Sequence, residues 1–236
     1  MSWYLANIVA LQALSFAVLP AAHAAGATTS YPSMASIEQY LIADRNAEIV
    51  LAQSAAPAAI SRDATILILG RRGYETAIEG KNGFACLVER SWMSPFDSAE
   101  FWNAKIRGPI CYNVSASRSI LPYTIRRTEL ALAGRSKAQM LERLQDDSAR
   151  KELPTPEPGA MSYMMSKDGY LGDAVGSWHP HLMFHIPKTD GVTWGANVPG
   201  SPVMLDDQHF VVPEPQTIFM VAVGYWSDAT PAPLRH

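Results

Sequence analysis

The sequence predicts an α+β fold in which an αα-hairpin packs against an antiparallel sheet. Short apolar runs bounded by turn residues lie in the first and last thirds of the chain, and two helical segments lie between them. The chain has 236 residues, of which 48% are hydrophobic and 17% are charged, so it can bury a sizeable core. This composition excludes a disordered chain, a coiled coil and a disulfide-dense miniprotein.

A meander of three antiparallel strands is the expected N-terminal part of the sheet. Its strands are residues 64–69, 74–79 and 84–91. Asn82-Gly83 separates the last two, and this pair is a strong hairpin signal because both residues tolerate the positive φ of a tight turn. One or two helical segments are expected before the meander, at residues 36–54, where apolar residues recur near helical spacing.

Two helices are expected in the middle of the chain, at residues 119–133 and 136–153. Gly134 is the C-terminal stop of the first, and a capping box of Ser136 and Gln139 begins the second. Residues 92–117, which precede them, are expected to be a long aromatic-rich connection. Four further strands would complete the sheet, at residues 160–166, 181–186, 211–212 and 217–224.

Residues 1–24 are typical of a secretory signal peptide. They contain no Asp, Glu, Lys or Arg, their central stretch is mostly apolar, and they end in Ala22-His23-Ala24. We expect cleavage after Ala24, which leaves residues 25–236 as a single domain that is periplasmic or secreted and is not an integral membrane protein. The alternative is an uncleaved N-terminal anchor, although a stable span needs roughly 20 apolar residues.

The charge balance and the two cysteines narrow the classes of function. A net charge of −3 gives no overall attraction to nucleic acid, so we expect no nucleic-acid partner. Cys86 and Cys111 would meet an oxidising compartment after export, and we expect them to form a structural disulfide. A nucleophilic Cys86 or a redox pair is the alternative, which no CxxC spacing supports.

A cluster of histidines is the clearest chemical signal in the sequence. Three of the six, His179, His181 and His185, fall within seven consecutive residues. In a strand these side chains share one face with Met183. The other face carries three apolar residues, Leu182, Phe184 and Ile186. This apolar face is the natural core face, so we expect the histidines on the wetter side of the sheet or in a pocket.

We expect His179 and His181 to form half of a metal or ligand site. Residues i and i+2 of a strand lie roughly 6.5–7 Å apart, so their two imidazoles can reach one ion. A complete site needs further ligands, and the weaker candidates are His185, Asp173, His209 and Met183. Zinc would suit a metal-dependent hydrolase, whereas copper would suit imidazole combined with thioether sulfur.

Two other interpretations of the same region stay open. A non-enzymatic envelope protein would bind a glycan or a protein partner through its aromatic loops, with Tyr170, Trp178 and Trp194 as contact residues. Alternatively, the histidines only form hydrogen bonds that stabilise a strand. The sequence contains neither GxSxG nor HExxH, so no familiar catalytic motif decides whether the protein is an enzyme.

The chain also resembles a group of uncharacterised exported bacterial proteins. The resemblance lies in four segments: GYETAIEGKNGFACLVERSW (73–92), RTELALAGRSKAQM (127–140), EPGAMSYMMSKDGYL (157–171) and WHPHLMF (178–184). It implies export and a single domain, and it implies no activity or site residue. The pattern of the group has Cys at the position of Ser162, which would let its members pair their cysteines differently.

Overall fold

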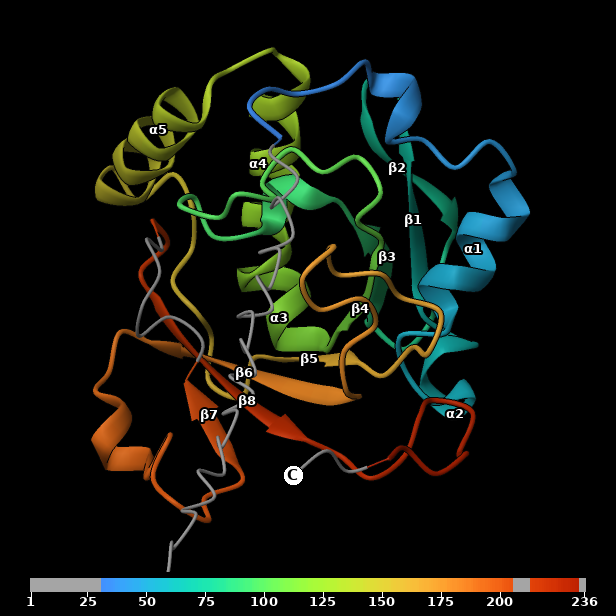
Figure 1. Cartoon of the computed structure of the whole chain (residues 1–236), viewed down its shortest axis with the longest axis vertical. Coiled ribbons are helices and arrows are strands. Elements are labelled where there is room, and N and C mark those ends of the chain that lie inside the picture. Colours follow the sequence, from blue (N-terminus) through green and yellow to red (C-terminus); the bar gives the residue numbers. More distant parts are fainter. Residues whose placement is uncertain (1–30, 206–212, 234–236) are drawn as a thin grey trace, which may run out of the picture.

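The computed structural model describes residues 31–205 and 213–233, which contain an eight-stranded sheet in the order β2-β1-β3-β4-β5-β6-β8-β7 (Figure 1). The strands are β1 (Thr65–Gly70), β2 (Gly73–Ile78), β3 (Ala85–Glu89), β4 (Gly108–Tyr112), β5 (Met161–Met164), β6 (His181–Pro187), β7 (Val203–Leu205) and β8 (Gln216–Ala222). All neighbouring strands are antiparallel except β1 and β3, which are parallel.

Helices cover both faces of the sheet, which confirms the mixed α+β class. They are α1 (Arg45–Gln53), α2 (Ala58–Ser61), α3 (Val114–Ser119), α4 (Leu121–Leu132) and α5 (Lys137–Ala149), with three short 3-10 turns, η1 (Ile37–Gln39), η2 (Ser91–Met93) and η3 (Gly191–Trp194). In Figure 1, α1 and α2 lie on one side of β1–β4, and α3 and α4 lie on the other side. The side that carries α3 and α4 contains the candidate site.

The prediction of an N-terminal meander is wrong in one strand pairing. β1 and β2 form a hairpin, but β3 pairs with the opposite edge of β1 and runs parallel to it. After β2 the chain passes the start of β1, where the backbone N–H of Lys81 donates to the carbonyl of Asp63 over 2.7 Å. A Cβ at Gly80 would lie 2.2 Å from the backbone nitrogen of Thr65, so this crossing needs glycine. The Asn82-Gly83 turn therefore ends a connection that crosses from β2 past β1 to β3, and it does not form a hairpin.

The two expected central helices are present as α4 and α5, but they are not a simple hairpin against the sheet. Gly134, with φ +71°, ends the first helical segment, and the capping box of Ser136 and Gln139 begins the second. Leu130 of α4 and Met140 of α5 belong to the same buried cluster. η1 and α1 lie within the region 36–54, where helical segments were predicted, whereas α2 and α3 are helices that the sequence pattern did not indicate.

β4 lies within the region that was expected to be a connection. All five of its residues are buried, and it pairs with β3 on one side and β5 on the other. Pro109 obscures this strand, because proline is normally confined to sheet edges, bulges and strand starts. The expected strand at 211–212 lies outside the described residues.

The alternation of side chains along β1 and β3 divides the core in two. Ile66, Ile68 and Val88 pack with Ala52 of α1 on one face. Leu87 belongs to a second cluster, on the face that carries α3 and α4, together with Ile110 and Tyr112 of β4. Two residues beyond Leu87, Glu89 at the end of β3 therefore lies on the α4 face.

The expected disulfide is confirmed. Cys86 and Cys111 are directly opposed in the antiparallel pair β3–β4, are fully buried, and are bonded to each other. Neither thiol is free, so a nucleophilic Cys86 is wrong. The expected signal peptide lies outside the described residues. In the chain from residue 31 onward that the structure covers, no helix is long and apolar enough to span a bilayer.

We expect loss of the disulfide to destabilise the fold by about 3.5 kcal/mol. The bond closes a loop with a sequence separation of 25 residues, and the chain-entropy relation gives this magnitude. The measurement is urea unfolding of the oxidised protein and of the Cys86→Ala/Cys111→Ala variant, followed by tryptophan fluorescence. Equal unfolding free energies would contradict a stabilising role for this bond.

Candidate functional site

A cavity of about 660 Å³ lies over the α4 face of the sheet. Its floor is formed by β3, β4, β5, β6 and β8, and α4 forms one wall. Residues 93–106 and 171–178 contribute the remaining walls, and two backbone hydrogen bonds between Arg107 and Tyr170 join these loops. Most of the lining is apolar, and its largest flexible side chains are Met93, Met164, Met183 and Met220.

The register of the sheet builds the cavity floor. Tyr112, Ser162, Met183 and Met220 lie opposite one another on β4, β5, β6 and β8, so their side chains share one face. Residues two positions away on the same strands, such as His185, face the same side. Side chains that are far apart in the sequence are thus brought to one surface.

Glu89 is the ionisable group that the floor presents to this cavity from the end of β3. Tyr112 Oη donates a hydrogen bond to its Oε1 over 2.6 Å, and Glu89 forms no ion pair among the described residues. Burial raises the pKa of the Glu89 carboxyl to about 7, against the opposing effects of Tyr112, Arg127 and Thr124. At neutral pH the cavity therefore contains a carboxyl group that is close to half ionised.

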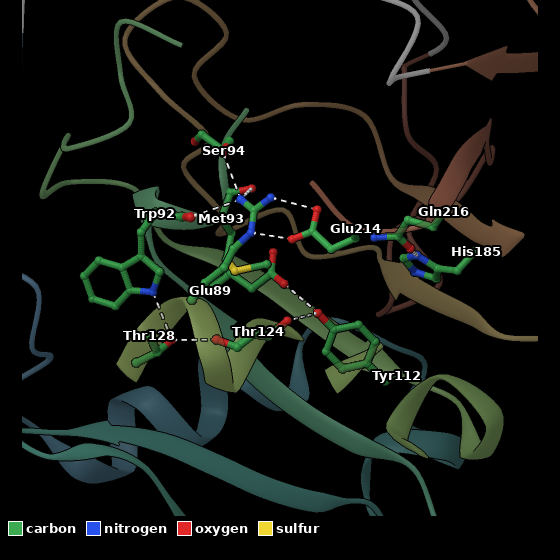
Figure 2. Close-up of polar contacts among 11 residues, drawn as sticks. Glu89, Trp92, Met93, Ser94, Tyr112, Thr124, Thr128, His185, Glu214 and Gln216 are labelled. Atoms are coloured by element: carbon green, nitrogen blue, oxygen red, sulfur yellow. Dashed lines mark hydrogen bonds and ion pairs between the residues drawn. The ribbon is translucent and has the colours of Figure 1, made fainter. Parts of the chain in front are cut away.

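A chain of hydrogen bonds holds Glu89 and its partner in place (Figure 2). Because Tyr112 uses its only proton on the ionised Glu89, Thr124 Oγ1 donates to Tyr112 Oη over 2.8 Å. Thr128 Oγ1 donates to the Thr124 carbonyl over 2.8 Å, and Trp92 Nε1 donates to Thr128 Oγ1 over 2.9 Å. These contacts fix the Tyr112 hydroxyl against α4 and so orient the carboxyl.

A buried ion pair closes one end of the cavity. Arg127 of α4 makes two hydrogen bonds to Glu214, of 2.7 and 3.1 Å, and both side chains are about 5% exposed or less. Its Nη1 also donates to three carbonyls of the loop that follows β3, those of Trp92, Met93 and Ser94. One guanidinium thus joins α4, this loop and the segment before β8.

The second arginine of the wall is also fully engaged. Arg90 is 0% exposed, and its Nε donates to the Tyr40 carbonyl over 2.7 Å. Its two terminal nitrogens donate to the Val88 carbonyl and to Glu48 of α1. Within the described part of the wall, neither guanidinium is left without a protein acceptor.

The face of β6 that carries His181 and His185 is buried and is not exposed to solvent. His181 and His185 are each 3% exposed, whereas Leu182, Phe184 and Ile186 of the other face are only partly buried. The expected wetter side is therefore wrong, while the alternative, a pocket, agrees with the cavity that both histidines line. The alternation itself is correct, but α3 and α4 cover the histidine face, which short-range sequence patterns do not indicate.

His181 lines the cavity and has one unprotonated ring nitrogen. Its Nδ1 lies 2.8 Å from the carbonyl of His179, which accepts its proton and leaves Nε2 with a lone pair. Trp178 packs edge-on against the ring, with centroids 4.5 Å apart. Burial lowers the pKa of His181 to about 4, so the ring is neutral at physiological pH.

His185 belongs to a relay that has the geometry of a catalytic triad. Its Nδ1 donates to Gln216 Oε1 and its Nε2 accepts from Ser162 Oγ, each over 3.0 Å. However, Ser162 is 0% exposed and is not part of the cavity wall, so a substrate cannot reach its hydroxyl. Burial lowers the pKa of His185 to about 4, and the relay acts as a satisfied structural network.

The other expected metal ligands are spread over the molecule. His179 lies beside a small hollow next to His181, and its buried Nε2 has no partner among the described residues. Asp173 is exposed, where it accepts from Tyr31, Tyr170 and Lys105, while Met183 faces the cavity. His209 lies outside the described residues. The described chain contains no cluster of three or more His, Cys, Asp or Glu that could hold a metal ion, so the metal site stays a prediction.

The three expected aromatic contact residues do not form one surface. Trp178 lines the cavity, and the Tyr170 hydroxyl is bound to Asp173. Trp194 stacks on Phe219 at 4.5 Å, on the opposite face of the sheet, and is 41% exposed. Only Trp178 therefore contacts the cavity that the histidines line.

The chain matches no protein-family model, no curated protein and no solved structure. The cavity is the feature of the described structure that indicates a function. The sequence pattern did not indicate its principal polar residues, which are Glu89, Tyr112, Arg127 and Glu214. One signal was available for Glu89. It continues the alternation of the apolar strand FACLVE toward a face that also carries Leu87.

We expect Glu214→Gln to lower the free energy of unfolding by about 3 kcal/mol, because it leaves the Arg127 charge buried without its counter-ion. Chemical denaturation measures this loss. Glu157→Gln is the matched control, since it breaks the exposed pair of Glu157 and Arg118 and should cost below about 1 kcal/mol. Similar losses in both variants would show that the buried pair contributes no more to the free energy of unfolding than the exposed pair does.

Proposed function

We propose that this protein binds a small, largely apolar molecule in the cavity between the sheet and α4. The observation that carries the proposal is the cavity itself, which has a volume of about 660 Å³ and a mostly apolar wall interrupted by a few polar groups. Volumes of about 300–1,000 Å³ with this mixture are typical of small-molecule sites. The expected export would make this an envelope or secreted binding protein.

The composition of the wall supports an apolar ligand. Met164, Met183 and Met220 extend flexible thioether side chains into the cavity from three neighbouring strands. Methionine adapts its shape to irregular partners and is frequent at binding surfaces. Trp178 adds a large aromatic surface on the same side. A ligand here would gain most of its affinity from burial of its apolar atoms.

We expect a neutral fluorescent probe, N-phenyl-1-naphthylamine, to bind the protein with enhanced emission, and Met183→Trp to weaken this binding by at least about tenfold because the indole fills the cavity. Leu182→Trp is the matched control, since Leu182 precedes Met183 on β6 and faces away from the cavity. Fluorescence titration gives both affinities, and near-ultraviolet circular dichroism verifies the fold. Equal binding by the two variants, or none by the parent, would contradict the proposal.

A metal site at His181 is a second proposal, and one observation favours it. The carbonyl of His179 holds the His181 Nδ1 proton, which leaves Nε2 as a ligand atom with a fixed ring, and Met183 is the next residue on that face. Zinc and copper remain the candidate metals.

Elemental analysis of untagged protein, purified without chelator, tests this second proposal. We expect near-stoichiometric zinc or copper in the parent protein and its loss in the His179→Ala/His181→Ala variant. Protein that contains no metal, with an equally folded variant, would remove the metal site and leave the apolar cavity as the basis for function.

A further inference from the structure

We propose that the ligand of this cavity carries a protonated amine that pairs with Glu89. This inference rests on the proposed function, because it assigns the chemistry of the molecule that the cavity would bind. An apolar body would contact the methionines and Trp178, and an ammonium group would donate hydrogen bonds to Glu89 Oε2. The other charged side chains of the described wall are already paired or hydrogen-bonded.

The positive groups of the described wall are unavailable to a ligand. They are Arg90 and Arg127, and each forms a buried ion pair, with Glu48 and with Glu214 respectively. Their remaining contacts go to backbone carbonyls. An anionic ligand would therefore have to disrupt a buried pair, which costs several kcal/mol.

The negative groups of the wall are not equivalent. Glu214 is paired with Arg127, and Glu100 accepts hydrogen bonds on both oxygens, from the Asn103 amide and from the backbone N–H groups of residues 173 and 174. Glu89 accepts a hydrogen bond from Tyr112 on Oε1, Thr124 also interacts with its carboxyl, and it forms no ion pair among the described residues. The described wall thus has a surplus of negative charge when Glu89 is ionised.

An ammonium group fits this surplus better than a neutral donor does. A carboxylate in a mostly apolar cavity is poorly solvated, and burial opposes its ionisation. A cation beside Oε2 would offset that penalty, whereas an alcohol would supply a hydrogen bond without a charge.

The other titratable groups around Glu89 keep a constant charge near neutral pH. Glu89 is therefore the residue of the described cavity wall whose charge changes in this range. Tyr112 of β4 and Tyr74 of β2 have raised pKa values and stay neutral. His181 and His185 of β6, with pKa values of about 4, are neutral above pH 5.5. The charge of Arg127 on α4 is held by Glu214. Affinity for an amine should therefore follow the ionisation of Glu89.

The test compares three naphthalene probes of similar size, 1-naphthylmethylamine, 1-naphthalenemethanol and 1-naphthoate, by isothermal titration calorimetry between pH 5.5 and 8. We expect the amine to bind roughly tenfold more tightly than the alcohol at pH 8, as a hydrogen bond between charged groups predicts. This preference should disappear by pH 5.5, because a Glu89 carboxyl with a pKa of about 7 is then protonated. The naphthoate should bind most weakly at pH 8.

Two variants assign the effect to Glu89. Glu89→Gln keeps the shape of the side chain and should abolish the preference for the amine over the alcohol at every pH. Tyr112→Phe removes the hydrogen bond that stabilises the carboxylate, so the midpoint of the amine preference should move to higher pH.

The possible failures are distinguishable. If the alcohol binds but the amine shows no preference, or if Glu89→Gln leaves the preference intact, the amine inference is overturned and the apolar binding function stands. Tighter binding of the naphthoate than of the amine would likewise overturn the amine inference and leave the apolar binding function standing. If none of the three probes binds, the proposed function fails, and the inference fails with it.

Discussion

The buried ion pair between Arg127 and Glu214 is the interaction on which the shape of the cavity depends. One guanidinium satisfies the Glu214 carboxylate and three consecutive carbonyls of the loop after β3, which would otherwise point into a low-dielectric interior without donors. It thereby joins α4 to this loop and to the segment before β8, and it closes one end of the space between α4 and the sheet. A hydrophobic side chain at residue 127 would fill volume but would leave these acceptors unsatisfied.

Glu89 is retained in this space although its charge opposes folding at neutral pH. Its pKa is about 7 in the folded protein and 4.5 as an ordinary glutamate, so the folded state binds the proton more tightly. This group therefore favours the folded state less as pH rises from 4.5 through 7. His181 and His185 have the opposite effect, since their lowered pKa values make the fold more stable as pH rises from about 4 to 6.5. A destabilising ionisable group in a cavity is typical of a functional site.

Short-range patterns predicted the helices and strands better than they predicted their arrangement. The capping box at Ser136 and the glycine stop at Gly134 act within a few residues, and both were correct. The alternation around His181 was also correct, but the sequence could not indicate which face α3 and α4 would cover. β4 was missed because Pro109 argues against a central strand, yet pairing on both sides holds it there.

By itself the sequence determined the α+β class, the partner of each cysteine and the extended conformation of the histidine segment. The class follows from the order of helical and strand-like segments, and the cysteine pairing follows because the chain has two cysteines. The extended conformation follows from the alternation of side chains over a few neighbouring residues. The tertiary structure decided the parallel pairing of β1 with β3 and the cavity above the sheet. It also placed Glu89 beside Tyr112 and joined Arg127 to Glu214 across 87 residues of sequence. These contacts depend on strand order and helix placement, which are set by packing between distant segments and leave no periodic signal in the sequence.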